Sequence, residues 1–147
     1  MAEILSENIK TKEILDWQGI HLLHFSGSSC SQKLRIFLNY KGIKWQSHSI
    51  SIATGQNYSN WFLGINPKGL VPVLVDDGKV IAESNDIIQY LEQKFPEPVL
   101  ISKEHEDSMA DHLKDEDDLH IDIRNIAYKM EMDCIFNPTN LYSFGVI

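Results

Sequence analysis

The feature that most constrains the fold is residues 66–84, with the sequence NPKGLVPVLVDDGKVIAES. Gly69 is a typical turn residue, because glycine adopts a positive φ without strain. The β-branched run that follows predicts a strand over 71–75. Asp77-Gly78 between two apolar runs predicts a tight hairpin, so residues 79–82 should return antiparallel to that strand. This segment therefore predicts a turn, a strand and a hairpin without spacers.

Pro72 lies inside the expected strand, where it cannot donate a ladder hydrogen bond, so it should lie where a sheet edge or a ligand needs no N–H. An X–Pro bond is also where a cis peptide costs least. If the Val71–Pro72 bond is cis, the backbone of Val71 would face outward and offer its N–H and C=O to a partner strand. Ser84 is expected to cap a helix that ends before Pro96. The segment thus predicts a dock for an extended peptide that carries a carboxylate.

Composition limits the possible functions. The 147 residues suffice for one ordinary domain, or for one small domain with a substantial appendage. No apolar run approaches the roughly 18 residues of a membrane span, and a formal net charge of −8 argues against nucleic acid. Cys30 and Cys134 lack CxxC spacing, and the first residues lack a signal peptide's apolar stretch. We expect a cytoplasmic protein without a membrane or nucleic-acid partner.

The remaining segments predict an α/β order. Residues 20–25 (IHLLHF) have the pattern of a strand buried on both faces, a helix should follow and end at Gly42, and residues 44–52 predict a second strand. This βαβ order should give a right-handed parallel unit. Residues 3–16 suit a short surface helix or a partly ordered arm. Beyond a linker at 97–102, two helical segments are expected, over 104–118 and 119–132.

Ser28-Ser29-Cys30 should lie where the first helix begins, and unpaired amide groups there favour a negative charge. A Cys30 thiol in the first turn would have a lowered pKa and become reactive. If the thiol belongs to a ligand, a serine hydroxyl can donate to its sulfur instead. Taken alone, the tripeptide is better explained by a capping serine followed by an inert buried cysteine.

Glu83-Ser84 could recognise a free amino-acid head, with Glu83 accepting the ammonium and the helix N-terminus holding the carboxylate. The alternative is an ordinary helix cap beside a solvated glutamate. Lys68 could reach a ligand carboxylate or be a solvated turn lysine, and Arg35 could brace the first loop. Acid-flanked histidines occur only at spacings of seven and eight, which do not place two metal ligands on one helix face, so no metal site is expected (His105, His112, His120).

Three motifs, in this order, resemble the glutathione transferase superfamily: SSCSQKLRIFLNYKGI, WFLGINPKGLVPVL and ESNDIIQYLEQKFPEP. The SSCSxKxR form is most similar to the zeta and tetrachlorohydroquinone-dehalogenase-like groups. The resemblance implies a thioredoxin-like βαβ–ββα domain over 20–98. An arm at 1–19 would precede it, and a short all-helical extension at 99–147 would form a partial C-terminal domain.

The resemblance also implies glutathione as the cofactor. Val71, before a cis Pro72, would pair with its cysteinyl backbone, and Glu83 and Ser84 would hold its γ-glutamyl head. Ser28 occupies the position of the catalytic serine or cysteine, and Ser29 and Cys30 are neighbours that can tune the thiol or form a mixed disulfide.

Two departures from the family affect this expectation. Leu70 and Asn57-Tyr58 stand where relatives hold the glycyl carboxylate, so Lys68 or Gln56 would have to substitute. The family's helical C-terminal domain needs about five or more helices, whereas the residues after Pro96 suffice for two. We therefore expect a homodimer or a partner-dependent oligomer, with the apolar face over 121–132 as the contact.

Three functions remain open from the sequence. The first is a glutathione-dependent transferase-like enzyme whose thiolate attacks a small electrophile or an unsaturated substrate. The second is a binding module of the same fold without a complete substrate domain. The third is thiol-disulfide exchange through Cys30.

Overall fold

The computed structural model describes residues 3–100 and 106–136. The chain divides into two compact units, Met1–Leu100 and Ile101–Ile147. The three-part division at residues 19 and 98 stays a prediction.

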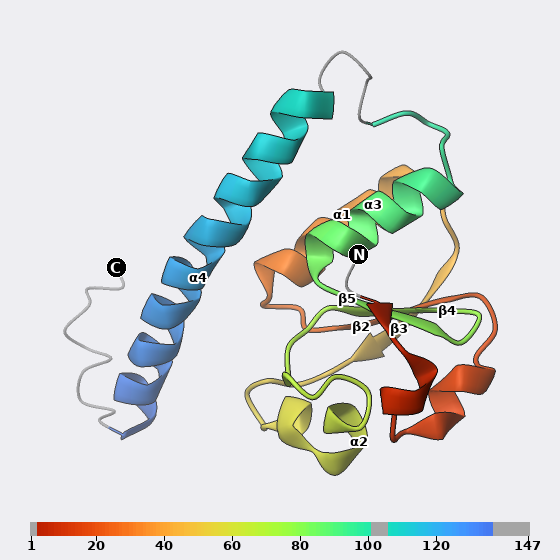
Figure 1. The fold of residues 1–147 in the computed structure, drawn as a ribbon. Helices are drawn as coiled ribbons and strands as arrows, with labels where there is room; N and C mark the ends of the chain where they lie inside the picture. The colour runs from red at the N-terminus through yellow and green to blue at the C-terminus, as the bar shows by residue number, and fades with distance from the viewer. Residues whose placement is uncertain (1–2, 101–105, 137–147) are drawn as a thin grey trace. The chain divides into compact units, whose positions relative to one another are not determined.

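One five-stranded sheet forms the centre of the first unit, in the order β1-β5-β4-β2-β3 (Figure 1). Its strands are β1 (Glu3–Ile4), β2 (Ile20–His24), β3 (Trp45–Ser49), β4 (Val73–Asp76) and β5 (Lys79–Ala82). β2 and β3 are parallel and β4 and β5 antiparallel, which confirms the βαβ unit and the hairpin. Asp77 and Gly78 have φ values of 48° and 80°, and this pair of positive angles gives the turn a twist that matches its strands.

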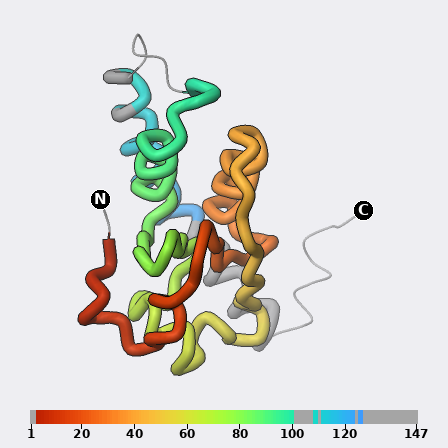
Figure 2. The backbone as a smooth tube through the Cα atoms, turned by 90° about the vertical axis from the view of Figure 1, so that its right-hand side faces the viewer, coloured from red at the N-terminus to blue at the C-terminus, as the bar shows by residue number. Residues whose placement is uncertain are grey.

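Helices cover both faces of this sheet. α1 (Ser29–Tyr40) and α3 (Ser84–Lys94) lie on one face. The other face carries α2 (Asn60–Leu63), the 3-10 turn η3 (Gln56–Tyr58) and the N-terminal turns η1 (Ser6–Asn8) and η2 (Lys12–Asp16), as the red and yellow segments of Figure 2 also show. Every residue of β2 is buried, as its apolar sequence predicts.

Alternate strand residues divide the core between these two faces. Leu22 and Leu74 pack with Leu34 and Leu91 of the helices α1 and α3. On the opposite face, the buried set joins strand residues to the N-terminal turns and α2, and comprises Ile9, Ile14, Leu23, Ile50, Phe62, Ile65, Val73, Val75 and Val80.

The expectation of a surface helix or loose arm over 3–16 is wrong. Ile4 of β1 pairs with Val80 of β5, and two 3-10 turns bury Ile9 and Ile14, which are 1% and 0% exposed. Backbone hydrogen bonds hold the segment to Gly64, which accepts from Lys10 at 2.7 Å. The physical reason is spacing, since apolar residues five apart cannot share one face of an α-helix but can anchor consecutive turns.

The second unit contains one long helix, α4 (Glu106–Phe136), in place of the two expected helical segments. Residues 106–136 contain neither glycine nor proline, so nothing in their sequence ends the helix early. Four of its apolar side chains are more than half exposed, namely Leu119, Ile121, Ile123 and Ile126. His105 and the tail at 137–147 lie outside the described residues. Within the described ranges, no helix is both long and apolar enough to cross a membrane.

Candidate functional site

The strand register gathers the predicted site residues at one end of the sheet. Leu23, near the end of β2, lies opposite Val73 at the start of β4, and Val73 lies opposite Ala82 at the end of β5. The helices α1 and α3 follow β2 and β5, so both helix N-termini lie at this end (Figure 1). The segment that enters β4, which contains Val71 and Pro72, reaches the same end. Three stretches far apart in the sequence therefore converge there.

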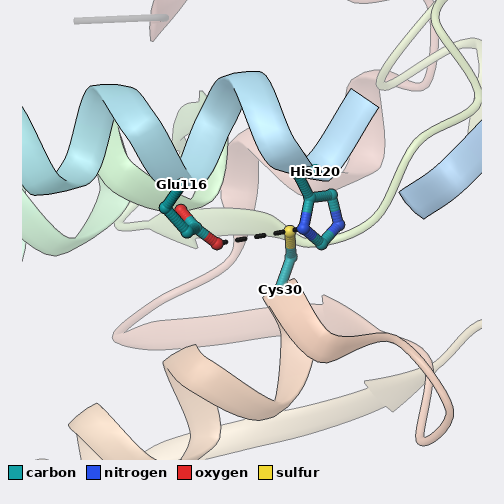
Figure 3. A group of neighbouring side chains, drawn as sticks. All are labelled: Cys30, Glu116 and His120. Atoms are coloured by element: carbon teal, nitrogen blue, oxygen red, sulfur yellow. Dashed lines mark ion pairs between the residues drawn. The ribbon is translucent and has the colours of Figure 1, made fainter. Parts of the chain in front are cut away.

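Ser28 is the N-cap of α1, and its Oγ accepts a hydrogen bond from the Ser31 amide at 3.2 Å. A hydroxyl that accepts in this way still has its own hydrogen to donate, so capping and donation to a ligand sulfur are compatible. Ser29 and Cys30 are the first two residues of the helix, and Cys30 is partly exposed (Figure 3). The sequence thus placed all three correctly at the helix start, where the helix dipole favours an anion.

The loop before α1 is fixed from two sides. Arg35 donates from Nη2 to the Ser26 carbonyl at 3.2 Å, so it braces this loop, one of the roles that the sequence left open. The fully buried Ser31 accepts from the Phe25 amide at 3.3 Å. These two contacts hold the backbone that presents Ser28.

Glu83, not Ser84, is the N-cap residue of α3, which corrects the expected cap position. Ser84 is the first residue of the helix and is 6% exposed. Glu83 has a φ of 64° and makes no side-chain cap hydrogen bond. This positive φ is the reason for the shift, because a residue in that conformation cannot continue the helix backward. A positive φ on a residue with a side chain also stores strain, which is a common property of ligand sites.

Lys68 donates from Nζ to Glu83 Oε1 at 2.7 Å. The two side chains are 65% and 45% exposed, so solvent screens the pair and its contribution to stability is small. Lys68 and Glu83, which the sequence assigned to the glycyl and the γ-glutamyl ends of glutathione, therefore contact each other. Either charged group can exchange this contact for one to a ligand at little cost.

Two buried asparagines, which the sequence analysis did not propose, hold the loop that carries Lys68. Asn66 donates from Nδ2 to the Leu70 carbonyl at 2.9 Å and accepts from the Lys68 amide at 3.2 Å. Asn57 is 0% exposed and donates to the Gly69 carbonyl at 2.9 Å. Asn66 could have been found from its place before a proline turn, where asparagine side chains bond the nearby backbone. Asn57 had no such local signal.

These contacts explain why Asn57 is unsuitable for binding the glycyl carboxylate, although relatives are expected to hold that carboxylate at this position. Asn57 turns its side chain into the protein, whereas Tyr58 is 62% exposed.

Pro72 precedes the hydrogen-bonded strand, because β4 begins at Val73 and not at residue 71 as expected. The Val71–Pro72 peptide bond is cis.

The two helix N-termini are also joined directly, since Lys33 of α1 donates to Asn85 Oδ1 of α3 at 2.6 Å. Burial lowers the pKa of His24, at the end of β2, and the nearby Arg35 and His48 lower it further. His24 is thus held neutral close to the start of α1. Its Nδ1 atom is buried without a hydrogen-bond partner among the described residues, whereas His21 bonds through both nitrogens, to the Gln18 carbonyl and to His48 Nε2, each at 2.9 Å.

On α4, His112 and His120 were not expected to form a metal site. Within this helix, His120 Nδ1 lies 3.9 Å from Glu116 Oε1, one turn away (Figure 3). His112 is exposed. These two histidines are eight residues apart on one helix, so they do not form a pair of ligands by themselves.

A parallel βαβ unit followed by an antiparallel hairpin and a helix defines a thioredoxin-like domain. Residues 27–94 match the family model described as glutathione S-transferase, N-terminal domain. Residues 27–94 are therefore similar to the N-terminal domain of the glutathione S-transferase family.

Two of the relatives that the chain matches are described as zeta-class proteins. The chain is 41% identical over 87 residues to a zeta-class glutathione S-transferase of Euphorbia esula, covering 58% of this chain and 39% of the relative. It superposes on a bacterial maleylpyruvate isomerase, described as a zeta-class glutathione S-transferase, with a TM-score of 0.54 and 33% identity over 56% of this chain and 39% of that one.

A human theta-2 glutathione transferase, solved in complex with glutathione, matches with a TM-score of 0.53 and 32% identity over 54% of this chain and 33% of that one. The chain thus spans about two fifths of the length of the curated relatives it matches, 39% for the Euphorbia protein.

Proposed function

We propose that this protein binds glutathione at the sheet end formed by the N-termini of α1 and α3 and activates its thiolate for attack on a small electrophile or an unsaturated substrate. The observation that carries the proposal is the convergence of Ser28, Val71-Pro72 and Glu83-Ser84 at that end. A transferase or an isomerase of the zeta kind would need this arrangement, and the zeta-class relatives support it.

In this proposal, each part of glutathione would have a counterpart at the site. The γ-glutamyl carboxylate would lie at the N-terminus of α3 by Ser84, and its ammonium would contact Glu83. The cysteinyl backbone would pair with Val71 in the manner of an added strand. Lys68 would release Glu83 to reach the glycyl carboxylate, which its exposure allows.

Activation of the thiol follows from the N-terminus of α1. The Ser28 hydroxyl and the helix dipole interact more strongly with a thiolate than with a neutral thiol, so they lower the pKa of the bound thiol. The thiol proton leaves to solvent, and the sulfur lone pair forms the new bond to carbon. With a small electrophile, the leaving group departs with the electrons of its bond to that carbon. With an unsaturated substrate, the π electron pair moves to the far atom, which takes up a proton or returns the pair when the sulfur leaves again. In this proposal, Ser29 and Cys30 lie next to the glutathione sulfur. The Cys30 thiolate could attack one sulfur of a mixed disulfide, whose other sulfur would leave as a thiolate.

Glutathione titration by calorimetry tests the binding step, and the ultraviolet absorbance of the bound thiolate as a function of pH tests activation. Turnover is then measured with chlorodinitrobenzene and with maleylpyruvate. We expect Ser28→Ala to raise the pKa of the bound thiol and to slow turnover more than Cys30→Ser does. The opposite order would favour exchange chemistry at Cys30.

Two results would contradict the proposal in different ways. Binding without turnover of either substrate would support a glutathione-binding module of this fold. No binding at millimolar glutathione would exclude both glutathione functions. The proposal also includes a cytoplasmic location and a dimeric or partner-bound state, which fractionation and light scattering would test.

A further inference from the structure

A cluster of aromatic rings joins the sheet to the N-terminal segment, on the sheet face that carries α2. His21 of β2 and His48 of β3, here called the histidine pair, approach with Nδ1 of His21 2.9 Å from Nε2 of His48. Their rings are 22° from coplanar, with centroids 5.2 Å apart, as in an in-line N–H···N hydrogen bond. Trp17 stacks on both rings, at centroid distances of 4.6 and 4.4 Å. One indole therefore rests on a hydrogen-bonded pair of imidazoles.

The hydrogen bonds of the histidine pair determine where its protons lie. A carbonyl oxygen only accepts, so His21 Nε2, which lies 2.9 Å from the Gln18 carbonyl, must carry a hydrogen. In a neutral His21 the Nδ1 atom is then the acceptor, and His48 Nε2 donates to it. A first extra proton binds the other nitrogen of His48 and leaves both hydrogen bonds intact. The pair therefore accommodates one positive charge, which the face of the Trp17 ring favours.

A second extra proton does not fit this arrangement. It would have to bind His21 Nδ1, where it would place two N–H donors and two positive charges opposite each other. His21 is 5% exposed and bonded to Gln18, whereas His48 lies in the edge strand β3 and is partly exposed. The His48 ring is therefore the one that would move away. Burial, followed by His21, lowers the pKa of His48, as expected where added charge is resisted.

The elements around the histidine pair bring no buried charge that would neutralise a second proton. The carboxylates of η2, Glu13 and Asp16, belong to exposed residues, and Glu13 accepts from Trp61 Nε1 at 2.5 Å. The other titratable group of β2 is His24, which would add charge of the same sign. α2 contains no charged residue, the rest of β3 is uncharged, and β4 places Val75 opposite the first member of the pair.

Trp17 also connects the histidine pair to α2. Its ring lies 6.5 Å from the ring of Trp61 in α2, and both tryptophans pack against the same buried cluster. The Trp61 carbonyl accepts from the Thr11 hydroxyl at 2.7 Å, so the N-terminal segment supports α2 at a second point. The loop that carries Lys68 follows α2 in the chain. A displaced Trp17 would remove part of the support of this loop.

From this geometry, we propose that the histidine pair is a pH-dependent latch for Trp17. One extra proton leaves the latch closed, and a second one opens it by moving His48 away from His21. Histidine clusters take up protons as the pH falls below about 6, so the latch would open in that range. Opening would loosen α2 and the loop of Lys68 and so regulate the proposed glutathione site. Only this last step rests on the proposed function.

NMR of the histidine ring nitrogens and of the tryptophan indoles, in the full chain as the pH is lowered, tests the latch. Near neutral pH we expect His21 as the Nε2–H tautomer. The pair should take up its protons in two steps, and the Trp17 indole signal should shift with the lower of the two macroscopic pKa values. His21 as the Nδ1–H tautomer, or a Trp17 signal that does not follow the lower step, would overturn the proposal.

His48→Gln removes the second proton site but keeps a partner for His21. A glutamine amide donates to the neutral ring, and after turning over it accepts from the protonated ring. We expect this variant to lose the acid shift of the Trp17 indole signal. His112→Gln, the same substitution at an exposed histidine of α4, should keep the shift. An acid shift of unchanged size in His48→Gln would refute the latch, and if this variant fails to fold, the titration of the unaltered chain decides.

S-methylglutathione, which has no thiol to titrate, tests the link to the glutathione site. Its affinity, measured by calorimetry, should fall roughly tenfold when the latch opens, the change that one pKa unit of linkage gives. His48→Gln should remove most of this decrease. Equal affinity with the latch closed and open would overturn the regulation of the site. Absence of binding at every pH would refute the proposed function, while the NMR titration would still decide whether the latch exists.

Discussion

Replacing Glu83 separates the backbone strain at the proposed glutathione site from the binding role that we propose for the Glu83 carboxylate. Glu83 has a φ of 64° and a ψ of 118°, a combination that residues with a Cβ rarely adopt. Such a conformation costs about 1–3 kcal/mol, and glycine adopts it freely. Glycine loses about 0.5–1 kcal/mol through its greater freedom in the unfolded chain. Glu83→Gly should therefore be more stable than Glu83→Ala by about 1 kcal/mol, the difference between these two effects.

This comparison cancels the other consequences of losing the side chain. Both variants lose the exposed contact to Lys68, whose small contribution is common to them. Both also lose the carboxylate that we propose for the glutathione ammonium, so both should bind glutathione roughly tenfold more weakly or worse. Both variants should therefore bind glutathione more weakly, but only Glu83→Gly should also relieve the backbone strain.

Urea unfolding followed by tryptophan fluorescence measures the stability difference. All three tryptophans lie in the Met1–Leu100 unit, so the signal reports the domain that contains Glu83. For a domain of this size, about 1 kcal/mol corresponds to roughly 4–8 °C in Tm. If Glu83→Ala proves as stable as Glu83→Gly, the positive φ stores no strain and the reasoning fails.

Three further substitutions test other parts of the unit. Ser28→Ala should lower the free energy of unfolding by about 1 kcal/mol through loss of the α1 cap, as measured by urea unfolding, and no loss would mean that the cap is not formed. Gly78→Ala should detach the N-terminal segment, because its Cβ would lie 2.2 Å from the Leu15 carbonyl oxygen at a φ of 80°; faster amide exchange over 3–16 is the expected result, and unchanged exchange would contradict it. The pKa of His48 is lowered by burial and by His21, so the unfolded chain binds more protons than the folded one below about pH 6.5. The free energy of unfolding should be highest above that pH and should fall as the pH drops through it toward the lowered pKa of His48. In His48→Gln, the free energy of unfolding should decrease less steeply over the same pH range. An unchanged dependence on pH would exclude His48 as a cause.

The sequence predicted the fold well where local patterns and the tertiary structure agree. The hairpin at Asp77-Gly78, the buried β2 and the helix end at Gly42 each have one strong local signal, and the structure confirms them. The family motifs that span these elements led to the same domain. Convergence of the candidate site residues followed from the strand order alone, because it fixes which strand ends meet.

The predictions from the sequence were wrong where the environment of a residue is set by residues far away in the sequence. The N-terminal segment was expected to be a short surface helix or a partly ordered arm, yet it pairs with β5 and buries Ile9 and Ile14. The cap of α3 moved to Glu83 because of backbone strain that no local pattern encodes. Asn57 was considered only as a missing anchor, whereas its buried bond to Gly69 depends on contacts twelve residues away.

The proposed glutathione site takes its preference for anions from the helices α1 and α3. Both helices run with their N-termini toward the convergence of Ser28 and Glu83 and their C-termini toward the sheet end at which β4 finishes with the buried Asp76. Parallel helix dipoles make the first end favourable for anions. The 12 residues of α1 separate the two ends by about 18 Å, at 1.5 Å per residue. At that distance the effects of substitutions at the two ends should add, so a glutathione affinity that changes in Asp76→Asn would indicate coupling through β4, the strand that joins Val71-Pro72 to Asp76.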